Sequence, residues 1–283
     1  MRLAKLAGRS TIVTDDGLID VASSSNGAFS ASTDKCIGQM EKLRSWYETF
    51  QPSPSEATKP EALYGDPRLG LIVTSPPQVF AVGLNYRQHA NEMGLDIPTQ
   101  PMIFTKFQSS LCGPNEEVPI PSSTTDFEAE LVVVLGATAR NLNVDDALGA
   151  VAGYCVGQDF SDRTLQMKGT SAQFSLAKSF RNFSPIGPWL TTADELAFPN
   201  SLSIGCSVNG SQFQQSTTSD MVFSVAEIVS YLSSIIELRT GDLIFTGSPH
   251  GVGHGRTPAV FLKPGDRVVT EIEKLGRIEN VTV

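Results

Sequence analysis

The sequence predicts a mostly-β, α+β fold, and two observations carry that prediction. Short β-prone runs separated by Gly- and Pro-containing turns dominate the chain from about residue 78 onward. The few helical patterns do not alternate with these runs, as they would in a protein built from βαβ units. With 283 residues, 40% of them hydrophobic, the chain is long enough to bury a large core.

Composition divides the chain into a small N-terminal α+β domain, residues 1–70, and a main domain, residues 71–283. The stretch "DDGLIDVASS" (15–24) indicates a hairpin or turn, and apolar positions at helical spacing predict a helix over 34–50. The Pro-, Ser- and Glu-rich segment 51–63 is typical of a surface linker. We therefore place the domain boundary shortly after this segment.

Most of the predicted strands belong to the main domain, and turn residues bound each of them. Together with one strand at the domain boundary, they are 69–73, 78–84, 102–107, 127–136, 152–160, 201–208, 242–247 and 266–273. Two further helices are expected. The helix at 144–152 has an acidic first turn that suits the helix dipole, and the helix at 224–238 has apolar residues at helical spacing.

Charge, hydropathy and cysteine content narrow the classes of partner. A net charge of −9 argues against nucleic acid and anionic membranes, because both require basic surfaces. No apolar run approaches the roughly 18 residues of a transmembrane helix, and the first residues lack the apolar segment of a secretory signal. The four cysteines are scattered without a CxxC pair, so we expect reduced thiols in a cytoplasmic protein.

Glu128 and Glu130 lie two residues apart in the predicted strand 127–136, so both carboxylates point to the same face. Charges on the wet face of a half-buried strand would be the ordinary explanation. The same face, however, continues with valines, and two carboxylates on an apolar face need a counter-charge or raised pKa values. A divalent cation supplies that charge, and Asp159, after the next strand, completes a set of oxygen ligands that suits Mg²⁺, Mn²⁺ or Ca²⁺.

The segment "VGLNYRQHANEMG" (82–94) carries the second candidate pair. His89 and Glu92 are three residues apart, so they share one face of a short helix. Such a pair is often no more than a surface histidine beside a surface glutamate. A carboxylate that orients an imidazole can also make it a general base, and the abrupt change from strand to helix here is typical of functional positions.

Two polar segments near the end of these strands are candidates for substrate binding. Arg163, Gln166 and Lys178 follow Asp159, and an anion held at a metal would need cations and amide donors of this kind. The Gly-rich segment 241–255 could cradle an anion with its backbone N–H groups, although a hairpin loop is the simpler interpretation. Its glycine spacing matches no nucleotide-binding motif, and its histidines have no partner motif, so we treat them as loop residues.

These motifs, taken together and in this order, resemble the fumarylacetoacetate hydrolase family over roughly residues 70–283. The motifs that carry the resemblance are "VGLNYRQHANEMG", "PMIFTKFQSSLCGP", "DFEAEL", the 158–179 run that ends in "AKS", "SDMVFSVAEIVSYLS" and "GDLIFTGSPHGVG" with the later "FLKPGD". The resemblance implies a mixed β-roll core with few helices, a homodimer and a divalent metal, most often Mg²⁺. Residues 1–70 are similar to the short N-terminal domain of many bacterial and fungal members.

The resemblance also implies roles for individual residues. Metal ligands are expected at Glu128, Glu130 and Asp159. Catalytic residues are expected at His89 and Glu92, the pair that activates water in acylpyruvate-cleaving members, and at Lys178, which contacts substrate near the metal. Substrate-binding positions are expected at Lys106, Arg163, Gln166 and Thr246.

The reaction expected from these charges is cleavage of a C–C bond in a small anionic 2-oxo acid through a metal-stabilised enolate. Hydrolysis of an acylpyruvate would use the His–Glu pair to activate water, whereas decarboxylation of an oxaloacetate-like acid needs no nucleophile. Isomerisation or hydration through the same enolate is an alternative, as is a biosynthetic reaction on a larger dicarbonyl substrate. The residues "SDRTLQ" after Asp159, and Arg181, depart from the family pattern beside the pocket and leave the substrate open.

Overall fold

A computed structural model describes residues 1–196 and 199–283 and confirms the predicted mostly-β, α+β class. The strands of the main sheet are β1 Arg2–Leu6, β2 Arg9–Val13, β3 Leu18–Asp20, β4 Val79–Gly83, β5 Met102–Thr105, β6 Leu111–Cys112, β8 Ala129–Leu135, β9 Val151–Gln158, β11 Ser184–Thr192 and β14 Leu243–Phe245. Their order is β3-β2-β1-β11-β9-β8-β14-β4-β5, with β6 paired to β11.

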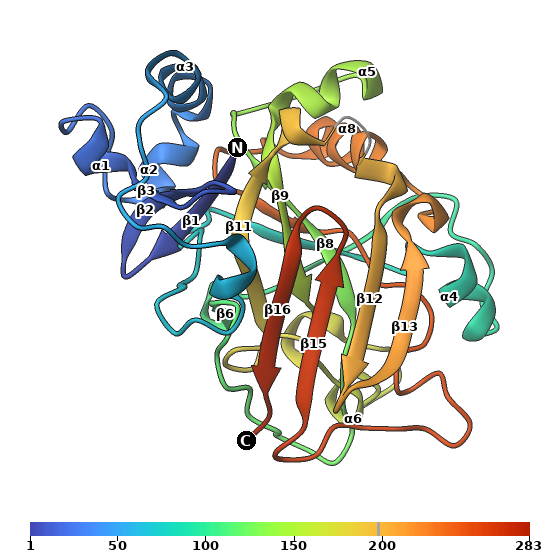
Figure 1. Ribbon diagram of the computed structural model, residues 1–283. Helices are drawn as coiled ribbons and strands as arrows, with labels where there is room; N and C mark the ends of the chain where they lie inside the picture. The colour runs from blue at the N-terminus through green and yellow to red at the C-terminus, as the bar shows by residue number, and fades with distance from the viewer. Residues whose placement is uncertain (197–198) are drawn as a thin grey trace.

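A second sheet and a strand pair complete the β structure of the described residues. The second sheet has the order β13-β12-β15-β16 and is formed by β12 Ser203–Val208, β13 Ser211–Thr217, β15 Arg267–Ile272 and β16 Gly276–Val281. The pair consists of β7 Thr125–Asp126 and β10 Ser161–Asp162. Figure 1 shows the second sheet stacked in front of β8 and β9, and β12 and β15 pack against these strands.

Helices are short and lie at the ends of strands. The α-helices are α1 Val21–Ser24, α2 Thr33–Ile37, α3 Met40–Phe50, α4 Arg87–Glu92, α5 Val144–Ala147, α6 Arg163–Gln166, α7 Phe174–Ala177 and α8 Val225–Ile235. Short 3-10 turns occur at Pro60–Leu63, Gln108–Ser110, Leu148–Ala150, Ala193–Glu195, Pro199–Ser201 and Thr218–Asp220. In the described part of the chain, no helix is both long and apolar enough to cross a membrane.

The central strand β8 is buried on both faces, which explains its unbroken apolar run. Leu131, Val133 and Leu135 pack into the core between the two sheets. Val132 and Val134, on the other face, pack into a core shared with the N-terminal segment. β8 pairs antiparallel with both β9 and β14, so it lies deep inside the main sheet. Side chains at its start are therefore held on a rigid, buried element.

The N-terminal segment extends the main sheet. The predicted hairpin is present: β2 and β3 pair around a turn closed by the N–H of Thr14 on the carbonyl of Gly17, at 2.9 Å. β1 pairs with β11, opposite Thr191 and Leu190. The domain boundary near residue 70 stays a prediction. The backbone pairing of β1 with β11 joins residues 1–70 to the rest of the chain.

Several sequence predictions differ from the structure in detail. The helix predicted over 34–50 is two helices, α2 and α3, interrupted at Gly38 and Gln39, where glycine lowers helix stability. The predicted strand 69–73 is wrong: Leu69 makes an isolated bridge to Leu6, and the rest forms bends that bury Ile72 and Val73 against the core.

The helix predicted over 144–152 is also shorter, because α5 passes into the 3-10 turn Leu148–Ala150 and β9 already begins at Val151. The long strand β11 had not been predicted. Pro185 and Pro188 lie inside it, and prolines argue against a strand within a sheet because they lack an N–H donor. The register between β11 and β9 shifts between Gly187 and Thr191, where Pro188 lies, so the sheet absorbs this proline at an irregularity.

Helix α8 follows the prediction closely. Ser224 caps its N-terminus together with Glu227 in a reciprocal capping box. Val225, Ile228, Val229 and Leu232 form its buried face, as the apolar spacing indicated.

Candidate active site

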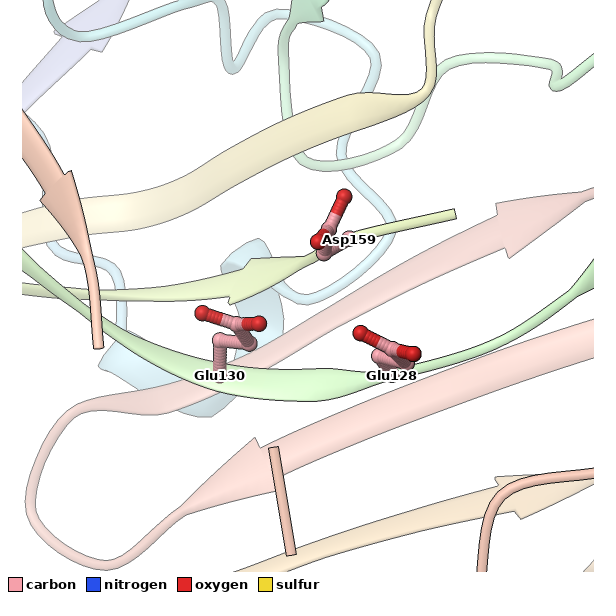
Figure 2. Close-up of side chains that lie close together, drawn as sticks. All are labelled: Glu128, Glu130 and Asp159. Atoms are coloured by element: carbon pink, nitrogen blue, oxygen red, sulfur yellow. The ribbon is translucent and has the colours of Figure 1, made fainter. Parts of the chain in front are cut away.

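Three carboxylates meet where β8 begins and β9 ends. Glu130 lies in β8, Glu128 immediately precedes that strand, and Asp159 immediately follows β9. The antiparallel register pairs Glu130 with Gly157, and the N–H of Asp159 donates to the carbonyl of Glu128 at 2.9 Å. Figure 2 shows Glu128 and Glu130 projecting from one side of their strand, with Asp159 on the neighbouring strand end. One oxygen from each lies within 4.8 Å of the others.

Lys178 and Arg163 neutralise part of this cluster. Nζ of Lys178 donates to Oε2 of Glu128 and to Oδ2 of Asp159, both at 2.7 Å, and to Oγ of Ser161 at 2.6 Å. All three of its N–H donors are therefore engaged. Arg163 donates to Oε1 of Glu128 at 2.5 Å. Glu128 is thus held between two cations.

Lys106 approaches the cluster from the opposite side of Asp159. It lies in the loop after β5, and its Nζ donates to Oδ1 of Asp159 and to the carbonyl of Lys178. Its side chain is fully buried. Burial lowers the pKa of Lys106, and the neighbouring carboxylate of Asp159 opposes that shift.

Glu128 and Glu130 are shifted in opposite directions, although they are two residues apart. Burial raises the pKa of Glu130 well above its usual range, and the charges of Asp159 and Glu128 raise it further. Burial also favours the neutral acid of Glu128, but Lys178 and Arg163 outweigh it and hold the pKa of Glu128 well below its usual range. Within the described part of the chain, Glu130 is therefore the carboxylate of the cluster without an ion-pair partner.

The cluster forms the floor of a cavity of about 210 Å³. His89, on α4, lines one side of this cavity, and its Nδ1 lies 3.0 Å from Oε2 of Glu92, which is outside the lining. If Nδ1 carries the proton that this carboxylate accepts, Nε2 is the free base. Burial favours the neutral acid of Glu92, yet its hydrogen bonds with His89 and the N–H of Gly251 keep its pKa below the ordinary value.

The Gly-rich loop after β14 connects this helix with the floor. The N–H of Gly247 donates to Oε2 of Glu130 at 2.8 Å, and the N–H of Gly251 donates to Oε1 of Glu92 at 3.0 Å. Both glycines have a positive φ. A Cβ at Gly251 would lie 2.2 Å from the carbonyl oxygen of Phe213, so a side chain does not fit there. The backbone N–H groups of this loop therefore hold two carboxylates of the protein itself, those of Glu130 and Glu92, as they would hold a bound anion.

The predicted substrate-binding residues separate into two groups. Arg163 and Gln166 line the cavity, and Oε1 of Gln166 accepts from Nη1 of Arg163 at 2.8 Å, so the amide nitrogen is the end of Gln166 that can serve a ligand. Lys106 and Thr246 lie behind the cavity wall. Oγ1 of Thr246 donates to the carbonyl of Leu131 at 2.9 Å, which ties β14 to β8.

Asp126 is a central residue of the site that sequence reasoning missed. It is fully buried, and its Oδ2 accepts from Nε and Nη2 of Arg163 at 2.9 and 2.7 Å. Its Oδ1 accepts the N–H of Gly253 at 2.7 Å, and its Oδ2 that of His254 at 3.0 Å. The signal was present, because Asp126 continues the period of two set by Glu128 and Glu130.

His254 also has a place that the sequence did not indicate. It lies in a loop, as predicted, and it also lines the cavity. The imidazole stacks against Phe261, with ring centroids 6.5 Å apart. His254 is exposed, so it stands at the open side of the cavity.

Comparison with known protein families identifies the chain. Residues 78–283 match the family described as fumarylacetoacetate (FAA) hydrolase C-terminal. The chain belongs to the fumarylacetoacetate hydrolase family. This confirms the resemblance predicted from the motifs and, because the family is one of hydrolases, the prediction of an enzyme.

Two curated relatives illustrate the range of this family. A 2,4-didehydro-3-deoxy-L-rhamnonate hydrolase from a Sphingomonas species is 47% identical over 215 residues, which is 75% of each chain. A fumarylacetoacetate hydrolase domain-containing protein 2 homolog from Dictyostelium discoideum is 45% identical over 216 residues, 72% of this chain and 71% of the relative.

Solved structures extend the likeness to the whole chain. A Mycobacterium smegmatis protein assigned as HpcE superposes with a TM-score of 0.92 at 46% identity and covers 100% of this chain and 99% of its own. Maleylpyruvate hydrolase from Sphingobium sp., in complex with manganese(II) and pyruvate, reaches 0.80 at 28% identity with the same coverage. Fumarylpyruvate hydrolase from Pseudomonas aeruginosa, with Mn²⁺ and pyruvate, reaches 0.67 at 34% identity over 74% of this chain and 90% of its own.

Proposed function

We propose that this enzyme hydrolyses a C–C bond of an acylpyruvate-type 2-oxo acid with the help of a divalent metal ion. The observation that carries the proposal is the convergence of three buried carboxylates on a cavity whose side wall presents His89, which is hydrogen-bonded to Glu92. Relatives with Mn²⁺ and pyruvate in their crystal structures support the same chemistry.

Glu128, Glu130 and Asp159 would hold the metal ion. The fit is chemical: three hard oxygen donors lie close together, and Glu130 is in no ion pair among the described residues, so its carboxylate is open to a cation. Mg²⁺ is our first candidate because it commonly retains open positions for substrate, with Mn²⁺ or Ca²⁺ as alternatives. A bound divalent ion would supply the positive charge that stabilises an enolate oxygen.

His89 is the proposed general base. Oriented through Nδ1 by Glu92, it takes a proton from water at Nε2, and the water oxygen attacks the distal carbonyl carbon of the acylpyruvate. The bond between that carbon and the methylene carbon of the pyruvate unit then breaks, and its electron pair remains on the pyruvate enolate. Transfer of the proton from Nε2 of His89 to the enolate carbon gives pyruvate and a carboxylic acid and restores the base.

The remaining predicted residues would bind substrate or support those that do. Arg163 and Gln166 line the cavity and can donate to the substrate carboxylate or its 2-oxo group. Lys178 pairs with Glu128 and Asp159 and would add positive charge beside the enolate. Lys106 and Thr246 act from behind the wall, by holding Asp159 and β14 respectively.

Decarboxylation and isomerisation are the second candidates, since both need the enolate and neither needs the activated water. A likeness to a probable 2-hydroxyhepta-2,4-diene-1,7-dioate isomerase from Mycobacterium abscessus, with a TM-score of 0.82 at 28% identity, favours keeping isomerisation open. A larger dicarbonyl substrate of secondary metabolism is the remaining alternative.

The test is a set of product assays on the purified enzyme with Mg²⁺, Mn²⁺, Ca²⁺ or EDTA. Acetylpyruvate should yield acetate and pyruvate only in the presence of a divalent ion. Release of CO₂ from oxaloacetate without acylpyruvate hydrolysis would favour the decarboxylase, and a shifted double bond in a dienoate would favour the isomerase. Hydrolysis that persists in EDTA would contradict the proposal.

A homodimer and a cytoplasmic location belong to the same proposal. The four cysteines are free and buried among the described residues, which is consistent with a reducing compartment. Sedimentation of the purified protein tests the dimer.

A further inference from the structure

The charges around the cavity floor come close to balance once a metal and one substrate carboxylate are added. Four buried carboxylates, those of Asp126, Glu128, Glu130 and Asp159, share this region with three cations. The cations are Lys106, Lys178 and Arg163. If a bound divalent ion keeps all four carboxylates ionised, the total charge changes from one negative to one positive. A single substrate carboxylate then neutralises the floor.

The cations that line the cavity have few free N–H donors for a second carboxylate. The three N–H donors of Lys178 are all engaged in hydrogen bonds, to Glu128, Asp159 and Ser161. Arg163 uses four of its five donors on Asp126, Glu128 and Gln166. Among the described residues that line the cavity, Lys178 is the only lysine and Arg163 is the only arginine.

Beyond the floor, the walls of the cavity are apolar. Met93 and Leu95 border it on the side of α4, and Met167 and Phe174 border it on the side of α6 and α7. Phe104 closes the space beside Lys178, with Nζ 5.7 Å from the ring centroid. Leu95 and Met167 are exposed, at 48% and 58%, so the cost of desolvating an unpaired carboxylate falls on the space between Met93, Phe104 and Phe174, which are half-buried.

We propose that the enzyme selects 2-oxo acids that carry a single carboxylate and an uncharged, largely apolar distal end. His254, at the open side, donates a hydrogen bond to a hydroxyl or carbonyl group on that distal end. This inference rests on the proposed function, because it takes the 2-oxo acid unit to lie at the carboxylate floor.

Binding of two unreactive acids to the Mn²⁺-loaded enzyme tests the selection without relying on turnover. 2-Oxohexanoate and 2-oxoadipate have chains of the same length that end in a methyl group and a carboxylate, respectively. By calorimetry at pH 8, where ordinary imidazoles are neutral, 2-oxoadipate should bind at least about tenfold more weakly. Equal or tighter binding of 2-oxoadipate would overturn the inference alone. Failure of both acids to bind would overturn the proposed function as well.

A cation added to the apolar wall should reverse the preference. Met167 lines the cavity, and its side chain is 58% exposed, so Met167→Arg can place a guanidinium at the wall with little risk to folding. We expect the dissociation constant of 2-oxoadipate, divided by that of 2-oxohexanoate, to fall by about tenfold in this variant. Leu176→Arg is the matched control, because Leu176 is 63% exposed on the adjacent helix and outside the cavity lining. An unchanged ratio in Met167→Arg, or the same change in Leu176→Arg, would contradict the inference.

Discussion

The floor and the side wall of the cavity are built in different ways. On the floor, Glu128, Glu130 and Asp159 belong to the start of β8 and the end of β9, and they lie in a buried network of ion pairs. On the side wall, His89 lies on α4, a helix of six residues that is held by a few contacts to loops. The floor is thus part of the sheet core, whereas α4 is an attachment to it.

This difference indicates a division of labour. Strands buried on both faces keep carboxylates within the narrow geometry that a metal ion requires. A short helix at the edge can adjust when substrate enters, and it brings the base to water. If this division is correct, damage to the floor should remove both metal binding and activity. Damage to α4 should remove hydrolysis while metal binding persists.

The largest expected effect is loss of the floor. Glu128→Gln removes the carboxylate that Lys178 and Arg163 share, and we expect hydrolysis to fall by about 1,000-fold or more, because the metal contributes several kcal/mol to catalysis. Calorimetric titration with Mn²⁺ and kinetic assays should decline together. Glu116→Gln, at an exposed position, is the control and should bind Mn²⁺ normally. Normal Mn²⁺ binding by Glu128→Gln would contradict the role of the floor.

Loss of the base should come next and should separate the two regions. His89→Ala is expected to lower kcat for acylpyruvate hydrolysis by about 100-fold or more, the usual contribution of a general base. Mn²⁺ affinity should stay within about twofold of the parent, because the imidazole does not contact the carboxylate floor directly. Glu92→Gln should give a smaller loss, since it keeps the hydrogen bond and removes the charge. A parallel loss of Mn²⁺ affinity in His89→Ala would show that α4 and the floor are not independent.

Asp126 tests how the floor is supported. Asp126→Asn weakens the anchor of Arg163 and of the loop that carries Gly253, so we expect Mn²⁺ affinity or kcat/KM to fall by about 10- to 100-fold. The melting temperature should fall as well, because the buried Arg163 loses part of its charge compensation. The matched control, Asp146→Asn, lies at an exposed position on α5. A variant with a lower melting temperature but unchanged metal affinity and kcat/KM would reduce Asp126 to a purely structural residue.

The smallest effect is expected at the attachment of α4. Arg87 holds the start of this helix through Nη1, which donates to the carbonyl of Met221. Because Arg87 is exposed, Arg87→Ala should lower kcat by about twofold and leave the melting temperature nearly unchanged. Arg140→Ala is the control, because it removes a similar hydrogen bond, from Nη1 of Arg140 to the carbonyl of Ser233. This variant should change neither kcat nor the melting temperature. A drop of 100-fold in Arg87→Ala would mean that α4 is as tightly constrained as the floor.

The sequence was a good guide wherever a local pattern carried the information. The period of two brought Glu128 and Glu130 to one face, and the spacing of three brought His89 to Glu92. The predicted strand 127–136 nevertheless begins only at Ala129, because Thr125 and Asp126 turn away to pair with β10. The apolar spacing of α8 was likewise sufficient, since its buried face follows from the helical repeat alone.

Residues that act through long-range contacts could not be recognised in the same way. Asp126 and Arg163 are 37 positions apart, and the loop that Asp126 anchors is 127 positions away at Gly253. The place of His254 depends on that loop. The substrate-binding roles expected for Lys106 and Thr246 stay predictions, and the structure adds their hydrogen bonds to Asp159 and to the carbonyl of Leu131.

By itself, the sequence determined the mostly-β class, the family, the carboxylate pair and the His–Glu pair, because each depends on residue type and short spacing. Only the tertiary structure decided that Glu130 lacks a cation while Glu128 has two. It also decided that Lys178 has no free donor and that the distal part of the cavity is apolar. The physical reason is that charge compensation and desolvation depend on which distant segments meet in space, and no local pattern of residues encodes that meeting.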